Sequence, residues 1–202
     1  MENQKIRVAI THGDTNGIGY ELIFKTFADA EMLELCTPIV YGSPKIAAYH
    51  RKALDIQGNF SIINSVDEAQ DGRINLLTCF DEELKVEFGH PNEGSGKAAL
   101  LALDKALTDY RHQAYDVLVN CPIDNKTIHV DGYPFENIAH YLETSIGEGK
   151  QTGTLYVSGQ QHLLIVTEDA EVKDVTHLLT KKVIVEKGEL LAQSLQRDFN
   201  IS

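Results

Sequence analysis

Short runs of branched apolar residues recur along the chain, separated by longer amphipathic stretches. The runs are IRVAIT near residue 6, PIVYG from Pro38, INLLTC from Ile74, DVLVNCP from Asp116 and HLLIVTE from His162. Apolar residues at consecutive positions are typical of strands that are covered on both faces of a sheet. The pattern therefore predicts a buried strand at each run.

The stretches between these runs have helical periodicity. Between Gly19 and Cys36 the apolar residues fall on one helical face, as expected of a helix that packs on a sheet. Ser43 followed by Pro44 is a favourable cap and first-turn pair for the next helix. Helices are predicted over residues 19–36, 43–54, 94–113 and 180–199.

Strand and helix alternate along most of the chain, which predicts an α/β fold with right-handed crossovers and a mainly parallel sheet. Between residues 59 and 88 the segments FSIIN, RINLLTC and LKVEF are separated by short polar turns. Strands joined in this way are often antiparallel. The expected sheet is therefore mixed but mainly parallel.

Charge and composition narrow the classes of function. The chain has 202 residues, 43% of them hydrophobic, so it can bury a substantial core. Its 30 acidic and 18 basic side chains give a formal charge of -12, which repels a phosphate backbone. We therefore expect no nucleic acid among its partners.

The same sequence predicts a cytoplasmic protein without a membrane partner. No stretch approaches the ~20 apolar residues of a spanning helix, and MENQKIRVAI does not have the pattern of a signal peptide. Cys36, Cys79 and Cys121 are far apart and odd in number, so neither a disulfide framework nor a zinc ribbon is predicted.

A glycine-rich turn follows the first predicted strand. In THGDTNGIGYE the glycines precede a helix, where they permit left-handed turns and let backbone N–H groups approach an anion. Their spacing is neither the dinucleotide fingerprint nor a Walker loop. The candidate loop or anion contacts are Gly13, Asp14, Gly17 and Gly19. The alternative is a tight connection in which Asp14 and Thr15 cap backbone donors.

A second polar turn, NCPIDNKTIH, follows the strand that begins near Asp116. Ligands of open α/β sheets bind beyond the carboxyl ends of the strands. Asp124, Asn125 and Lys126 are therefore further candidates for anion contacts, and the alternative is an ordinary surface loop.

Two later groups of polar residues are also candidates. His140 lies on a predicted helix, where a packing role is more common than a ligand role. Glu168, Asp169 and Glu171 follow a predicted strand and can hold a hard divalent cation through oxygen. The alternative for this acidic loop is simple solvation.

Taken together, these segments resemble a known family. Their residues and their order are similar to those of the 4-hydroxythreonine-4-phosphate dehydrogenases of pyridoxal phosphate biosynthesis. The segments that carry the resemblance are THGDTNGIGYEL, TPIVYGSPKIAAYHRKAL, DVLVNCPI, YPF, KDVTHLLTKKVIVEK and the closing LLAQSLQRDFNI. The resemblance runs from end to end of this chain but covers only the N-terminal part of the usual family member.

The resemblance implies a three-layer α/β/α fold like that of the isocitrate and isopropylmalate dehydrogenases, truncated relative to the family. It implies two domains, with residues 1–120 in the first and residues 121–202 forming part of the second, dimerisation and metal-side domain. It also implies a homodimer whose site takes residues from both chains.

The implied chemistry is an NAD-dependent oxidation of a small phosphorylated hydroxy acid, followed by decarboxylation. A divalent metal (Zn, Mg, Mn or Co) would polarise the secondary alcohol while hydride leaves to NAD. The family's first metal histidine matches Asp169 here, a ligand that favours harder ions such as Mg²⁺ or Mn²⁺. The remaining metal histidines belong to the part of the family that this chain does not cover.

Several positions depart from the family pattern. The histidine and threonine that bind substrate in the family correspond to Ile138 and Ala139, and Lys126 stands one place late in its turn. Each hydrogen bond lost to a charged ligand costs ~1.5–3 kcal/mol. We therefore expect this chain alone to be inactive; the alternative is a non-catalytic paralogue or fragment that keeps the scaffold as a binding or interaction module.

Overall fold

The computed structural model describes residues 5–56, 58–81, 84–129, 135, 137–150, 152–167 and 170–201. The chain divides into two compact units, residues 1–138 and 139–202. The boundary between these units lies at Ile138, later than the predicted domain boundary after residue 120. The assignment of residues 121–202 to a dimerisation and metal-side domain stays a prediction.

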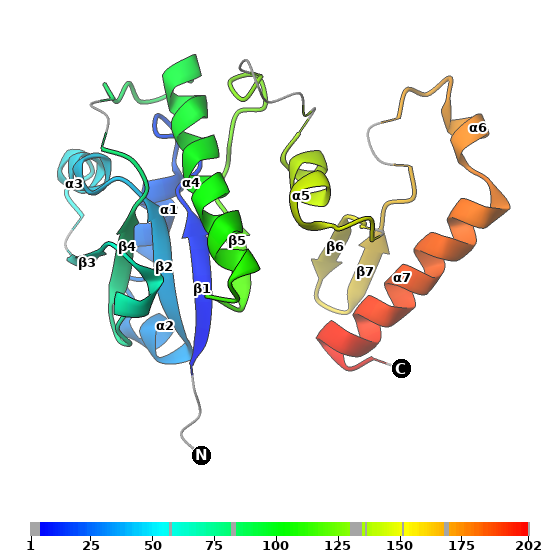
Figure 1. The fold of residues 1–202 in the computed structure, drawn as a ribbon, viewed down its shortest axis with the longest axis horizontal. Coiled ribbons are helices and arrows are strands. Elements are labelled where there is room, and N and C mark those ends of the chain that lie inside the picture. Colours follow the sequence, from blue (N-terminus) through cyan, green and yellow to red (C-terminus); the bar gives the residue numbers. More distant parts are fainter. Residues whose placement is uncertain are drawn as a thin grey trace. The chain divides into compact units, whose positions relative to one another are not determined.

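The first unit is built on a five-stranded sheet with the order β3-β4-β2-β1-β5 (Figure 1). Its strands are β1 (Ile6–Thr11), β2 (Cys36–Gly42), β3 (Phe60–Ile63), β4 (Ile74–Thr78) and β5 (Val117–Asn120). All four neighbouring pairs are parallel. The predicted α/β class with a mainly parallel sheet is confirmed.

Two sequence-based predictions about this sheet are wrong. β3 and β4 pair in parallel, because the connection between them, which includes the 3-10 turn Val66–Glu68, returns to the end of the sheet at which β3 begins before β4 starts. The segment LKVEF, residues 84–88, is not a strand. Backbone groups of this segment and of the residues after it bond instead to Asn16, as described below.

Helices cover both faces of the sheet. They are α1 (Gly19–Thr26), α2 (Ala30–Leu35), α3 (Pro44–Ala53) and α4 (Glu93–Arg111). Side chains of α1 and α3 pack with Ile10, Val40 and Leu76 in one buried cluster. Ala102 and Ala106 of α4 pack with Ala9 and Ile39 on the opposite face. The unit is therefore a three-layer α/β/α arrangement (Figure 1).

The single helix predicted from Gly19 to Cys36 is wrong. α1 ends at Thr26, and a new helix, α2, begins at Ala30. The carboxylate of Asp29 accepts a hydrogen bond from the Glu31 N–H at 3.0 Å, which caps the second helix. Cys36 already belongs to β2. Local capping by Asp29 therefore overrides the continuous apolar periodicity.

α4 is the longest helix of this unit and fits its prediction. Asn92 accepts from the Ser95 N–H at 2.9 Å while the Ser95 hydroxyl accepts from the Asn92 N–H at 3.0 Å, a reciprocal capping box. Ala99, Ala102 and Ala106 are fully buried. Their small side chains let the helix approach the sheet closely.

The second unit has a simpler structure. It contains α5 (Ile138–Ile146), which begins at the last residue of the first unit, the antiparallel pair β6 (Leu155–Ser158) and β7 (Gln161–Leu164), α6 (Val175–Leu178) and α7 (Lys181–Phe199). The run HLLIVTE was predicted to be a strand covered on both faces, and this is wrong because β7 alternates between exposed and half-buried residues. Among the described residues of this unit, Tyr141 is the only buried hydrophobic side chain.

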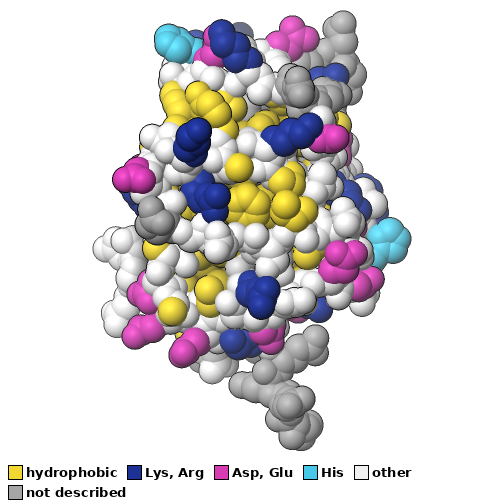
Figure 2. All heavy atoms as spheres, turned by 90° about the vertical axis from the view of Figure 1, so that its left-hand side faces the viewer, with side chains coloured by type: hydrophobic (Ala, Val, Ile, Leu, Met, Phe, Trp, Pro, Cys, Tyr) yellow, Lys and Arg dark blue, Asp and Glu magenta, His cyan; other side chains and the backbone are white. Residues whose placement is uncertain are grey.

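The surface of the first unit on the side of α3 and β3 mixes apolar and basic groups. Figure 2 shows hydrophobic atoms gathered near its centre, with Lys and Arg side chains between and around them. Tyr49 of α3 and Ile62 of the edge strand β3 are exposed hydrophobic residues. Within the described part of the chain, the helices lack the length and apolar character that a membrane crossing requires.

Candidate functional site

The candidate site lies where β1 and β5 end side by side. The chain runs from β1 to β2 on one side of β1, whereas β5 pairs on its other side, so strand order reverses between β1 and β5. In open α/β sheets ligands bind beyond the carboxyl ends of strands at such a reversal. The Thr11 hydroxyl donates to the Asn120 side-chain oxygen at 2.5 Å and ties the two strand ends together.

The two polar turns predicted from the sequence meet at this edge. The Asp14 N–H donates to the Pro122 carbonyl at 3.0 Å. Gly13 has φ +73°, and a Cβ atom there would lie 2.3 Å from the same carbonyl oxygen. A side chain is therefore excluded both by backbone conformation and by the neighbouring turn.

The β1–α1 loop, residues 12–18, is held by its own polar groups. The Asp14 carboxylate accepts from the Asn16 N–H at 2.7 Å and from the Ser95 hydroxyl at 3.0 Å. The Asn16 side chain donates to the His90 carbonyl at 2.8 Å and accepts from the Glu87 N–H at 2.9 Å. The loop is thereby fixed to the start of α4 and to the segment before it.

The glycines of this loop also serve close packing. A Cβ atom on Gly19 would lie 1.8 Å from the His12 carbonyl oxygen, and the Gly17 N–H donates to the Asp14 carbonyl at 3.0 Å. These contacts match the alternative of a tight connection. A role for Gly13, Asp14, Gly17 and Gly19 as anion contacts stays a prediction.

The second turn presents more open groups. The Asp124 carboxylate accepts from the Lys126 N–H at 2.8 Å, and the Thr127 hydroxyl donates to the Asp124 carbonyl at 2.8 Å. The side chains of Asn125 and Lys126 are exposed. Asp124 therefore shapes the turn, while Asn125 and Lys126 are the members of this set that can reach a ligand.

Sequence reasoning missed a buried cluster beneath the loop, made of His12, Tyr20, Ser43 and His50. The His12 ring stacks on Tyr20 at 5.2 Å between ring centroids, and the His50 ring lies 5.1 Å from Tyr20. The Ser43 N–H donates to the Tyr20 hydroxyl at 3.0 Å. His50 lies on the buried face of α3 with Ile46 and Ala47, so its position on that stripe was the available signal.

Burial controls the protonation of both imidazoles. Burial, with a smaller contribution from the charge of His50, lowers the pKa of His12 from 6.5 to about 4, against the opposing effect of the backbone at Gly13. Burial also lowers the pKa of His50, opposed by the Thr15 carbonyl and by Glu21. Both rings are therefore neutral near pH 7.

Ser43, predicted to cap α3, does not do so. Its side chain makes no capping hydrogen bond, and its hydroxyl has no hydrogen-bond partner among the described residues. The helix begins without this cap because Pro44 already fixes φ at its first position.

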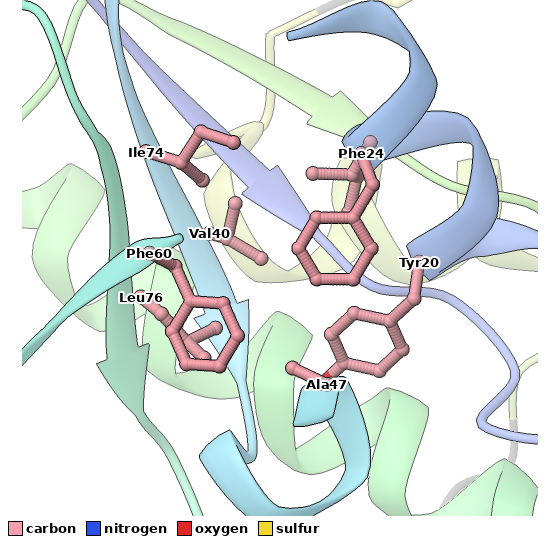
Figure 3. Close-up of a pocket in the computed structure, with 8 residues that line it drawn as sticks. Tyr20, Phe24, Val40, Ala47, Phe60, Ile74 and Leu76 are labelled. Atoms are coloured by element: carbon pink, nitrogen blue, oxygen red, sulfur yellow. The ribbon is translucent and has the colours of Figure 1, made fainter. Parts of the chain in front are cut away.

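A gap between α1, α3 and the sheet is not a ligand site. Its lining is formed by Tyr20, Ile23, Phe24, Val40, Ala47, Phe60, Ile74 and Leu76, and Figure 3 shows seven of these labelled around it. The lining presents no polar surface, and the gap has no room for a water molecule. It belongs to the packing of the core.

Comparison with known proteins identifies the family. The family model of the pyridoxal phosphate biosynthetic protein PdxA matches residues 34–202. This chain belongs to the PdxA family. A PdxA relative, the 4-hydroxythreonine-4-phosphate dehydrogenase of Bacteroides thetaiotaomicron, is 46% identical over 201 residues, which cover 100% of this chain and 55% of the relative. The Aquifex aeolicus enzyme of the same name is 28% identical, with 96% and 59% covered.

Solved PdxA-family structures have the same fold. The 4-hydroxythreonine-4-phosphate dehydrogenase of Klebsiella pneumoniae gives a TM-score of 0.80 at 17% identity, covering 98% of this chain and 60% of that one. The Burkholderia phymatum enzyme gives 0.78 at 21% identity, covering 93% and 57%. The chain thus spans between half and two thirds of the length of these relatives.

The positions that the PdxA resemblance assigns to substrate lie at the start of α5. Ile138 is half-buried and Ala139 is exposed. Neither side chain can donate or accept a hydrogen bond. His140, the next residue, is exposed and makes an interaction of its own.

The metal that the PdxA resemblance implies has no ligand group among the described residues. Asp169 and Glu168 lie outside the described residues, and elsewhere in the described ranges no group of three or more His, Cys, Asp or Glu side chains is arranged to hold a metal ion. Gly13 and Gly19 pack closely against the backbone of Pro122 and His12, and NAD binding stays a prediction of the PdxA resemblance.

Proposed function

We propose that the protein containing these residues is an oxidoreductase of pyridoxal phosphate synthesis that acts on 4-hydroxythreonine 4-phosphate or a closely related phosphorylated hydroxy acid. The observation that carries this proposal is the match to the Bacteroides enzyme of that name, which extends over 201 residues at 46% identity. A match over the whole chain supports a common framework as well as common motifs.

In this proposal the β1/β5 edge supplies one wall of the substrate site. Lys126 is an exposed cation at this edge and suits the phosphate or carboxylate of the substrate. The bond between Thr11 and Asn120 keeps the two turns in register. The backbone bond between Asp14 and Pro122 does the same.

NAD and a divalent metal are part of this proposal only because the PdxA resemblance implies them. Because the described residues form no metal-ligand group and NAD binding stays a prediction, we assign no step to either cofactor here. We further propose that these 202 residues do not turn over substrate by themselves, and that the active form is a homodimer in the cytoplasm.

A second candidate is a non-catalytic PdxA paralogue that keeps the scaffold as a binding module. Ile138 and Ala139 favour it, because apolar side chains stand where the resemblance places a histidine and a threonine. Two lost hydrogen bonds to a charged ligand weaken binding by orders of magnitude, at ~1.5–3 kcal/mol each.

A chimera tests the two candidates. Residues 1–202 are joined to the portion of the Bacteroides relative beyond its matched region, and NADH formation is followed with NAD, Mn²⁺ or Mg²⁺ and 4-phosphohydroxythreonine. The intact relative is the positive control, and the 202-residue chain is assayed in parallel. An active chimera beside an inactive 202-residue chain supports the dehydrogenase.

The double variant Ile138→His, Ala139→Thr separates the remaining outcomes. Activity that is present only in this variant supports the non-catalytic paralogue. A folded chimera, verified by cooperative unfolding, that stays inactive with both substitutions contradicts the dehydrogenase. NADH production by the 202-residue chain contradicts the proposal that these residues do not turn over substrate by themselves. A monomeric mass of the active chimera in light scattering contradicts the proposed homodimer.

A further inference from the structure

His50 makes a contact that the proposed function does not use. Its side chain is 1% exposed, and its Nε2 atom lies 2.7 Å from the Thr15 carbonyl oxygen. A carbonyl can only accept, so Nε2 must carry the hydrogen. The contact joins α3 to the β1–α1 loop across 35 positions of sequence.

The other ring nitrogen of His50 has no comparable partner. The Nδ1 atom is buried and makes no hydrogen bond with the described residues. The ring is packed edge-on against Phe88 at 4.8 Å and lies 5.1 Å from Tyr20. A proton taken up at Nδ1 would therefore leave both a buried donor and a buried charge unsatisfied.

The groups around the His50 imidazole stabilise its protonated form only weakly. Glu21 of α1 is the carboxylate that favours the charged ring, whereas His12 at the end of β1 stays neutral down to about pH 5 because burial lowers its pKa to about 4. In the segment of Phe88, Glu87 is paired with Lys85 at 2.6 Å. On α3 itself the titratable neighbours are Tyr49 and Arg51, and the latter donates to the Gly58 carbonyl.

We propose that His50 is the positioning residue of the β1–α1 loop: the neutral imidazole holds the Thr15 carbonyl, and protonation of the ring releases it. A charged ring is stabilised by moving into water, and this movement breaks its bond to Thr15. Freed at Thr15, the loop keeps its contacts with Ser95 and Pro122 but loses its tie to α3. The inference rests on the proposed function only in that this loop borders the candidate site.

Hydrogen exchange of the 202-residue chain tests the hydrogen bond between His50 and Thr15 in the absence of substrate. The reporters are the amides of Asp14, Asn16 and Gly17, which donate within or next to the loop. The reference is Leu76 in the buried strand β4. Protection factors, corrected for intrinsic exchange, are compared from pH 7.5 to pH 5; protonation of His12 in the unfolded chain lowers global stability over this range, and Leu76 reports that global loss.

We expect loop protection in the wild type to fall about tenfold over this range, the size of one hydrogen bond to a buried carbonyl, in addition to any global loss reported by Leu76. In His50→Gln, whose amide can still donate to Thr15, loop protection at pH 7.5 should be retained and become independent of pH. In His50→Leu it should be about tenfold lower at every pH. The control His112→Gln removes an exposed imidazole from the end of α4 and should behave as wild type.

Three results would overturn the assignment: constant loop protection in the wild type, equal pH dependence in His50→Gln, or unchanged protection in a folded His50→Leu. If His50→Leu does not fold, the wild type and His50→Gln decide the matter alone. A fall in loop protection that is the same in the wild type and in His50→Gln and equals the fall at Leu76 would mean exchange through global unfolding and would also count against a local contact. An inactive chimera would contradict the proposed enzyme without affecting these exchange measurements.

Discussion

Asp14 and Gly13 were candidates for ligand contact, and the structure gives each a defined internal contact. Asp14 accepts hydrogen bonds from Asn16 and Ser95, and Gly13 lies against the Pro122 carbonyl. Asn16 is a local partner, whereas Ser95 and Pro122 lie far along the chain from this turn. The residue types in the turn were readable from the sequence, whereas their partners were not.

Gly13→Ala should lower the free energy of unfolding much more than Gly72→Ala. The two glycines have φ values of +73° and +71°, so the backbone strain of about 1 kcal/mol is shared. A Cβ atom on Gly72 meets nothing within 4 Å, whereas on Gly13 it lies 2.3 Å from a backbone oxygen. We expect a loss of about 1 kcal/mol for Gly72→Ala and of about 3 kcal/mol or more for Gly13→Ala in urea unfolding. Equal losses would contradict the close packing of the two turns.

His12 should make the fold sensitive to acid. Its pKa is about 4 in the folded chain and near 6.5 when unfolded, so the unfolded state binds the proton more readily. The stability that this group contributes is fully present above pH 6.5 and is lost as pH falls toward 4. At pH 5 the loss relative to pH 7 is about 2 kcal/mol.

The variant His12→Phe isolates this effect, because it keeps an aromatic ring on Tyr20 and removes the titrating group. Urea unfolding of both proteins at pH 7 and pH 5 should give a pH-dependent loss that is about 2 kcal/mol smaller in the variant. Comparison within each protein cancels any change in packing. The same loss in both proteins would show that His12 is not the titrating group.

At the scale of elements, helix ends were the least predictable features. The apolar stripe from Gly19 to Cys36 is continuous in the sequence, yet α1 ends at Thr26 and Asp29 caps a separate helix, α2. Ser43 is a residue type that often caps helices, but its side chain makes no capping hydrogen bond. Asn92, in contrast, forms a reciprocal capping box with Ser95. The residue type shows which side chains can cap a helix, and the backbone geometry determines which of them do.

Substitution of the two residues separates these roles. Asn92→Ala should lower the free energy of unfolding by about 1 kcal/mol, because it removes the acceptor for the Ser95 N–H. Ser43→Ala should change it by less than about 0.5 kcal/mol, because the hydroxyl that it removes is unpaired among the described residues. Chemical denaturation measures both values, and a Ser43→Ala loss as large as that of Asn92→Ala would contradict the assignment.

At the scale of the whole molecule, the core belongs to the first unit. Apart from Tyr141, the buried hydrophobic residues of the described chain lie between Ala9 and Ile128. The first compact unit ends at Ile138 along the chain, and the second begins at Ala139. The stability of the first unit should therefore depend little on the second.

Separate expression of the two units checks this division. Residues 1–138 should unfold cooperatively on heating, with a midpoint within a few degrees of the main transition of the full chain. Residues 139–202, with one buried hydrophobic side chain among those described, should show no cooperative transition in circular dichroism. A non-cooperative first unit would contradict the prediction.

The sequence by itself determined what depends on neighbours a few positions away: the main strands, the helix α4, the α/β class and the motifs of the PdxA family. The tertiary structure decided the parallel direction of β3, the meeting of the two polar turns and the burial of His12 and His50. These features arise from contacts such as Asp14 with Ser95, which are 81 positions apart. Periodicity reports which side of an element is apolar, but only the folded chain brings such distant residues within hydrogen-bond distance.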